Sequence, residues 1–188
     1  MPEYRKEWLE KSRIDYFSPF IALWLSCNSW YRSHYADVGT VDRNLVDKIK
    51  SDYTTRNLLY KRFKDLFTAN SRDGISFRTN IELLHYALEN ASVTSDSGII
   101  CSLRYTVLDY DHKSVTCDLT GKENDTANSV RLEKIWVTKD TTKLFPGTFE
   151  IMYQIRNMLI HGNINPSPEH HEIIKYCYAF LFQLMTGI

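Results

Sequence analysis

The sequence predicts a mainly α-helical bundle that carries a small antiparallel β insertion. Over most of the chain, apolar residues recur at steps of three and four, the spacing of one helix face. The pairs Ser18-Pro19 and Ser167-Pro168 are typical of helix starts, because serine caps the first turn and proline fits the first helical position. Between about residues 97 and 138 the pattern changes to runs of β-branched and aromatic residues. We therefore expect a single domain over residues 1–188, with the β insertion at about 97–138.

The N-terminal part of the chain predicts two helices. Residues 4–13 are charged and could form a short amphipathic helix. Residues 20–35, opened by Ser18-Pro19, are apolar nearly all round, which predicts a central helix. Asn28 lies on one face of this helix and needs hydrogen-bond partners if it is buried. It could be a packing amide or a group that lines a groove.

Three further helices are expected before the β insertion. Asp42 can cap the first of them, which contains Leu45, Val46 and Ile49. Thr54 or Thr55 starts the second, and residues 71–74 read as a turn. The third spans residues 75–90, and its apolar stripe includes His85. A histidine in that position is typical of a core edge, hydrogen-bonded to backbone, rather than of a catalyst.

The β insertion is expected to begin with a hairpin. Residues 99–108 and 114–119 read as its strands, and residues 109–113 as its turn. A third strand could span residues 130–137, joined by an exposed polar loop at 120–129. Such an insertion could shield a site, bind a partner or cap the bundle.

The C-terminal part returns to the helical pattern. Residues 145–148 lead into a helix that runs to about residue 160, and Ser167-Pro168 opens the last helix. The first turn of the last helix reads Glu-His-His-Glu at residues 169–172, but it lacks the HExxH spacing of a zinc site. It therefore reads as a solvated helix start. We expect no metal site and no cofactor, since no glycine-rich phosphate loop is present either.

The charges of the chain are balanced, with 23 Lys and Arg against 23 Asp and Glu. This balance argues against a protein that binds nucleic acid through a uniformly basic surface. The first 64 residues carry 12 basic against 8 acidic side chains, which could form a local phosphate-facing patch or an ordinary solvated surface.

The cysteines and the apolar runs indicate the cellular compartment of the protein. The four cysteines include no CxxC pair, and the polar first residues do not resemble a signal peptide, so we expect reduced thiols in a cytoplasmic protein. The longest apolar run is far shorter than the roughly 20 residues of a spanning helix, and no membrane role is expected.

The strongest pointer to chemistry is the pair Arg156 and His161. Arg156 falls within the apolar arc of its helix, where a guanidinium needs an acceptor nearby. His161 lies about 140° further round a regular helix. Gly162 follows it and is a good left-handed helix end, so His161 should sit at the terminus, where its ring can reach solvent or an interface.

The segment Arg156-Asn157-Met158-Leu159-Ile160-His161 resembles the R-(polar)-x3-H motif of the HEPN family. The resemblance implies a HEPN-like helical bundle that dimerises so that two motifs face each other. Many members of that family are metal-independent ribonucleases of toxin, defence or RNA-processing systems, and others lack activity. The chain has no second Arg-x4-His.

The resemblance implies that the ribose 2′-hydroxyl of RNA attacks the adjacent phosphate and leaves a 2′,3′-cyclic phosphate. Histidine titrates near neutral pH, so His161 could take or donate the proton. Arg156 would neutralise the charge on the transition state, and Asn157 could orient the guanidinium of Arg156. These three are the expected catalytic residues.

Two other interpretations remain open at this stage. The chain could be a non-catalytic HEPN-like dimer that binds nucleotide, RNA or a protein, or an interaction module that binds through its β insertion. In either case Arg156 would tie its helix to a carboxylate elsewhere. For the enzyme we expect RNA as substrate, a homodimer as the active unit, and an antitoxin or regulatory protein as a further partner. The wide apolar stripe over residues 149–160 and the apolar helix at residues 20–35 would together supply surface for the dimer, unless the β insertion covers it.

Overall fold

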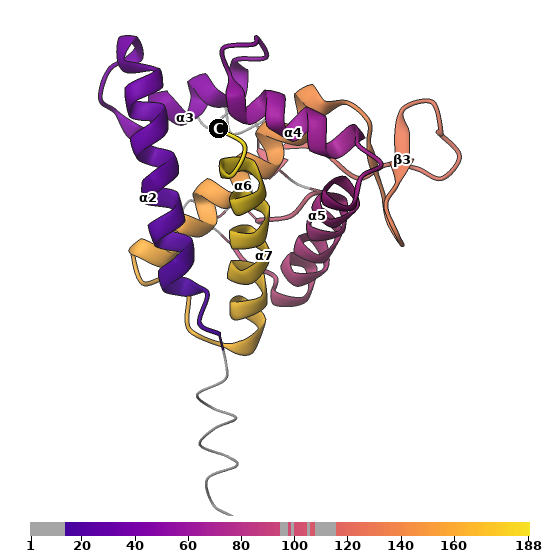
Figure 1. Ribbon diagram of the computed structural model, residues 1–188. Coiled ribbons are helices and arrows are strands. Elements are labelled where there is room, and N and C mark those ends of the chain that lie inside the picture. The colour runs from indigo at the N-terminus through magenta and orange to yellow at the C-terminus, as the bar shows by residue number, and fades with distance from the viewer. Residues whose placement is uncertain (1–13, 95–97, 99, 105, 108–115) are drawn as a thin grey trace, which may run out of the picture.

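Long helices make up most of the described chain (Figure 1). The structure is a computed structural model that describes residues 14–94, 98, 100–104, 106–107 and 116–188. Its helices are α2 (Phe17–His34), the short 3-10 helix η1 (Ala36–Val38), α3 (Asp42–Ser51), α4 (Leu58–Thr68), α5 (Arg72–Ala91), α6 (Thr141–Ile160) and α7 (Pro168–Met185). The predicted mainly α bundle with a small antiparallel β insertion is confirmed. The helix predicted at residues 4–13 lies outside the described residues.

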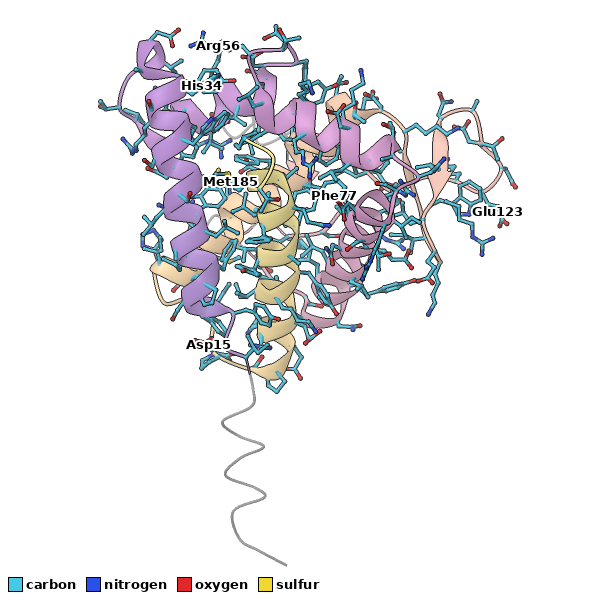
Figure 2. The ribbon with its side chains drawn as sticks, in the orientation of Figure 1. Asp15, His34, Arg56, Phe77, Glu123 and Met185 are labelled. Atoms are coloured by element: carbon cyan, nitrogen blue, oxygen red, sulfur yellow. The ribbon has the colours of Figure 1, made fainter. Side chains whose placement is uncertain are left out.

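The helices are held together by aromatic side chains. In Figure 1, α7 lies between α2 and α5, with which it packs, while α6 crosses behind α2 and α7. The ring of Phe63 lies 5.4 Å from that of Phe77 and 5.4 Å from that of Phe145, and Phe77 stacks on Phe180 at 4.9 Å. Figure 2 shows Phe77 among the side chains that fill the space beside α7. One aromatic cluster thus joins α4, α5, α6 and α7 in a fully buried core.

The β insertion consists of two short hairpins rather than longer strands. β1 (Thr106–Val107) pairs antiparallel with β2 (Thr116–Cys117), so the first predicted hairpin is confirmed, although its strands are shorter than predicted. Its turn lies outside the described residues. The predicted single strand at 130–137 is wrong, because β3 (Ser129–Arg131) turns back at Glu133 and Lys134 and pairs with β4 (Trp136–Thr138).

That turn is fixed by a buried side chain of the helical bundle. The carboxylate of Glu82, on α5, accepts hydrogen bonds from the backbone N–H groups of Glu133 and Lys134 at 2.7 and 3.0 Å. Glu82 therefore attaches the β3–β4 hairpin to the helices, and the predicted exposed loop at 120–129 is partly paired, since Thr120 bridges to Val137.

Several helix starts differ from prediction. α2 begins before Ser18-Pro19, and the side chain of Asp15 accepts from the backbone N–H of Phe17 at 3.0 Å, so Ser18 is not the cap. Asp42 is the first residue of α3 and does not cap it. Neither Thr54 nor Thr55 starts α4, which is capped by Asn57. The N-cap residues of α2 and α3, Tyr16 and Val41, make no side-chain capping bond.

The predicted turn at residues 71–74 is instead the first turn of α5. The hydroxyl of Ser71 accepts from the backbone N–H of Gly74 at 3.2 Å and caps the helix. Gly74 is required by space, because a Cβ there would collide with the carbonyl of Ala69. The predicted Ser167 cap of α7 is confirmed, since its side chain accepts from the backbone N–H of His170.

α6 begins at Thr141, several residues before the predicted position, and contains Pro146. Proline lacks the N–H that would bind the carbonyl of Thr142 one turn earlier. The hydroxyl of Tyr53 donates to that carbonyl at 2.9 Å. The acceptor freed by the proline is therefore satisfied from the loop before α4, which explains why the helix continues through this position.

A buried ionic network joins α3 to α6. The carboxylate of Glu150, on α6, accepts from Arg43 at 2.8 and 3.0 Å and from Lys50 at 2.6 Å. Gln154 adds a hydrogen bond at 2.6 Å. Burial alone would raise the pKa of Glu150, but Lys50 and Arg43 outweigh it and hold the pKa below its usual value. The carboxylate stays charged, and every charge in this part of the core has a partner.

We predict that Glu150→Gln lowers the free energy of unfolding by about 3 to 5 kcal/mol, because it leaves the buried Lys50 with only the partly exposed Asp47 as its anion. Because the folded pKa is depressed, the contribution of Glu150 is present above its usual pKa of 4.5 and is lost as the pH falls through the folded value. Urea unfolding between pH 3 and 7 measures both effects.

The matched control is Glu123→Gln, since Glu123 is exposed and lies at the edge of the molecule in Figure 2. The control should change stability by less than about 0.5 kcal/mol. Equal stability losses in the two variants would contradict the structural role of Glu150.

Candidate active site at the end of α6

The C-terminal end of α6 is a Schellman motif. The backbone N–H of Asn163 donates to the carbonyl of Met158 at 2.8 Å, and that of Gly162 donates to the carbonyl of Leu159 at 3.2 Å. Gly162 has φ +73°, the left-handed conformation that favours glycine. The predicted helix end at Gly162 is confirmed, and His161 is the C-cap residue.

His161 is exposed at this helix end. Its φ of −82° and ψ of −1° remain close to helical values, so its side chain still points about 140° away from that of Arg156. Within the described part of the chain, no side chain forms a hydrogen bond with its ring. The imidazole is free to meet a ligand or a second molecule.

Arg156 is held in a largely buried position, with its side chain 18% exposed. Its guanidinium donates to the side-chain oxygen of Asn157 at 2.8 Å and lies 3.6 Å from the carboxylate of Asp42. It also lies over the ring of Trp24, with 5.8 Å from Cζ to the ring centroid. The acceptor that the sequence requires for Arg156 is therefore provided by its neighbour Asn157 and by α3.

The hydrogen-bonding capacity of Arg156 is mostly unused. A guanidinium has five N–H donors. Among the described residues, only Asn157 accepts a hydrogen bond from it, because the distance to Asp42 is too long for a good one. Its Nε is buried without a partner, and so is Nε1 of Trp24, the ring on which it lies. Two donor groups at one contact thus lack acceptors.

A hydrogen-bonded group on α2 and α3 surrounds the carboxylate that faces Arg156. Oδ1 of Asp42 accepts from the hydroxyl of Tyr31 at 2.6 Å and from the amide of Asn28 at 2.7 Å. Arg32 approaches the same oxygen at 3.5 Å. We call the whole group the Asp42 cluster, and its members are Asn28, Tyr31, Arg32, Asp42, Arg156 and Asn157.

Tyr31 supplies a permanent donor to this cluster. Burial and the hydrogen bond to Asp42 raise the pKa of Tyr31 far above its usual value. Its hydroxyl therefore stays protonated at any physiological pH and keeps donating to Asp42. Asn28 is satisfied by neighbours in the same cluster, which supports its interpretation as a packing amide.

The residues that the structure brings together at the site differ from those that the sequence predicts. Arg156 and Asn157 contact each other as expected, while His161 extends from the helix end without contacting either of them in the described contacts. The sequence predicts Asp42 as a helix cap and predicts no role for Arg32. The spacing of Asn28 and Arg32 by four residues on one helix was the available signal for that pair.

Other candidate groups do not form sites. His85 is buried and its Nδ1 has no hydrogen-bond partner in the described region, so the predicted backbone bond is not found at that atom, and burial lowers the pKa of its ring. The described residues include no cluster of three or more His, Cys, Asp or Glu that could hold a metal. None of the described helices has both the length and the apolar character needed to cross a bilayer.

Within residues 14–64, several positive charges are paired with carboxylates. Arg43 and Lys50 bind Glu150 in the core, and Lys61 pairs with Asp65 at 3.0 Å. Arg56 pairs with Asp37 at 2.7 Å, and its carbonyl binds His34 beside it at the far end of α2 (Figure 2). For residues 14–64 these pairs favour the ordinary solvated surface, while the four basic residues before them lie outside the described residues.

Comparisons with known proteins give no relationship for this chain. No family model matches it, and neither a curated protein nor a solved structure shows significant similarity to it. The functional argument therefore depends on the residues of the site.

We predict that Asp42→Asn lowers the free energy of unfolding by about 1 to 3 kcal/mol, because Tyr31 and two arginines lose a charged acceptor while the side-chain volume is kept. Urea denaturation measures this change. The control is Asp65→Asn, whose exposed ion pair with Lys61 should contribute less than about 1 kcal/mol. If the two variants unfold alike, Asp42 does not hold this cluster together.

Proposed function

We propose that this protein is a HEPN-type, metal-independent endoribonuclease that cleaves RNA to a 2′,3′-cyclic phosphate. The observation that carries the proposal is the state of Arg156, which is held in place by Asn157, Asp42 and Trp24, while among the described residues no acceptor binds its Nη2. An anchored guanidinium with unused donors suits an anion that carries several oxygens. The exposed His161 at the end of the same helix supplies a group that can transfer protons.

In the reaction the enzyme accepts one proton from the substrate and donates one to the leaving group. The 2′-hydroxyl oxygen attacks phosphorus and gives its proton to a histidine, the bond from phosphorus to the 5′-oxygen breaks, and that oxygen takes a proton from an imidazolium. Arg156 stabilises the extra negative charge on the phosphoryl oxygens. Asn157 keeps the guanidinium oriented through their hydrogen bond of 2.8 Å. The products are a 2′,3′-cyclic phosphate and a free 5′-hydroxyl.

The active unit in this proposal is a homodimer. Arg156 and His161 of one chain point about 140° apart, so one copy does not readily aim both at one phosphate. Two copies related by a two-fold axis would bring the arginine of one to the histidine of the other. Leu25, Val41 and Ile160 support this arrangement, because each is more than half exposed and lies close in sequence to Asn28, Asp42 or His161.

The dimer surface differs from the one expected from the sequence. Most of the apolar stripe of α6 is buried within the chain, where β1 and β4 pack against this helix and the side chain of Leu119 fills the space beside Gly147. Only its last turn, with the exposed Ile160, remains available. The interface that we propose is therefore smaller and lies on the exposed last turn of α6, next to the Asp42 cluster.

The second candidate function is a non-catalytic dimeric binding module for nucleotide, RNA or a protein. It is favoured by the ion pair between Arg156 and Asp42, which gives the arginine a structural role.

In the first proposal, the enzyme would act in the cytoplasm as a toxin or defence effector, restrained by an antitoxin or another regulatory protein. The experiments below separate these two functions.

We predict that the purified protein cleaves single-stranded RNA in excess EDTA and that His161→Ala lowers the rate by at least about 100-fold, the contribution of general acid–base catalysis. Because His161 is exposed, the variant should keep the melting temperature of the wild type. Gel analysis and mass spectrometry of the product ends measure cleavage and identify the cyclic phosphate.

His171→Ala is the matched control, since His171 lies at the start of α7, where its ring binds the carbonyl of Ile14. It should leave the rate unchanged. If the wild type cleaves none of the RNAs, or if His161→Ala is as active as the wild type, the protein is not this enzyme and the binding module is favoured.

Arg156→Lys should keep the fold but lower the cleavage rate by roughly 100-fold or more, because an ammonium cannot reproduce the planar fork of donors. Mixing this variant with His161→Ala tests the composite site. Exchange of subunits would give mixed dimers in which one of two sites has an intact arginine and an intact histidine, and activity should return to roughly a quarter of the wild-type value.

The mixture is compared with each variant alone at the same total concentration. A mixture as inactive as its components would mean that both groups act within one chain. An unfolded Arg156→Lys protein, identified by circular dichroism, would assign Arg156 to structure alone.

A further inference from the structure

Arg32 is the second guanidinium of the Asp42 cluster and is held as firmly as Arg156. Its Nε donates to the side-chain oxygen of Asn28 at 2.7 Å, and another of its nitrogens donates to the carbonyl of Thr40 at 3.1 Å. A third lies 3.5 Å from Asp42. Its side chain is nevertheless 42% exposed, so a fixed positive charge is presented to solvent next to the motif.

The two arginines share one carboxylate, and each lies near a different oxygen of it. Arg32 approaches Oδ1 of Asp42, whereas Arg156 approaches Oδ2. One negative charge therefore faces two positive charges, and part of the negative charge is already bound by Tyr31 and Asn28. The cluster keeps an excess of positive charge, which favours a further anion at its surface.

The position of Asp42 decides how such an anion would bind. Because the carboxylate lies between the two guanidinium groups, a single phosphate cannot take the central position and contact both in the same way. Two phosphates that follow each other along a chain can contact one arginine each. The arrangement suits a polyanionic backbone better than a single phosphate group.

We propose that Arg32 binds the phosphate next to the scissile one, so that the substrate is an RNA chain with flanking phosphates rather than a dinucleotide. This inference rests on the proposed function, in which Arg156 contacts the scissile phosphate. Asp42 then acts as a positioning residue, because it fixes the separation of the two guanidinium groups. Arg32 contributes to substrate binding and leaves the chemical step to Arg156 and His161.

Two substrates of the same sequence test the proposal. A dinucleoside monophosphate has only the scissile phosphate, whereas an octanucleotide also has flanking ones. Arg32→Gln should lower kcat/KM for the octanucleotide about 10-fold, through KM, and leave kcat/KM for the dinucleoside monophosphate unchanged. Arg32→Lys, which keeps the charge, should recover most of the loss.

Lys64→Gln is the control, because Lys64 is an exposed cation on α4, away from the Asp42 cluster. It should affect neither substrate. An equal loss of kcat/KM on both substrates in Arg32→Gln would mean that Arg32 acts on Arg156 through Asp42, and no loss on either would mean that it does not contact RNA. Both results overturn the proposal.

A binding measurement separates this inference from the proposed enzyme. A 2′-O-methyl octanucleotide lacks the attacking hydroxyl, so its binding, followed by fluorescence anisotropy, is independent of cleavage. For the wild type, the logarithm of the binding constant should fall with the logarithm of salt concentration, and Arg32→Gln should reduce this slope by about 0.7, the value for one phosphate contact on a single strand.

Different results of the cleavage and binding measurements would contradict the two proposals. Salt-dependent binding that requires Arg32 in a protein that cleaves nothing would support the phosphate contact and reject the enzyme. A wild type that does not bind the octanucleotide, or an unchanged slope in Arg32→Gln, would overturn the contact even if cleavage is observed.

Discussion

The contact between Glu150 and the two cations of α3 is the constraint on which the site depends. A buried carboxylate is tolerated only where its charge is matched, and Arg43 and Lys50 are both supplied by α3. Glu150 lies six residues before Arg156 on α6, and Arg43 directly follows Asp42 on α3. Because Glu150 holds Arg43 against α6, the neighbouring Asp42 is held facing Arg156, which lies about one and a half turns further along α6.

Local signals in the sequence were sufficient for the parts of the fold that depend on local physics. The spacing of apolar residues predicted the helices, and Gly162 predicted the end of α6, because a left-handed residue and its two backbone hydrogen bonds involve only the adjacent turn. The helix starts were less predictable. Ser18 and Thr54 have suitable side chains, but α2 begins at Phe17 without a side-chain cap, and Asn57 caps α4.

The candidate site was predictable only in part. The motif placed Arg156, Asn157 and His161, and the polarity of Arg156 within an apolar arc required an acceptor. The identity of that acceptor depended on how α3 packs, over 100 residues away in the chain, and Asp42 had an adequate local explanation as a helix cap. For Arg32 the local signal was its spacing of four residues from Asn28 on the same helix, whereas its contacts with Thr40 and Asp42 depend on the turn between α2 and α3.

The left-handed residue after His161 has a consequence for the stability of the site. A Cβ on Gly162 would meet no atom within 4 Å, so another side chain would fit there without any collision. The cost would come from the backbone alone, at about 1 to 2 kcal/mol for most residues. A substitution would therefore make the last turn of α6 less stable by that amount. Gly162 therefore stabilises the end of α6, and with it the position from which the side chain of His161 extends.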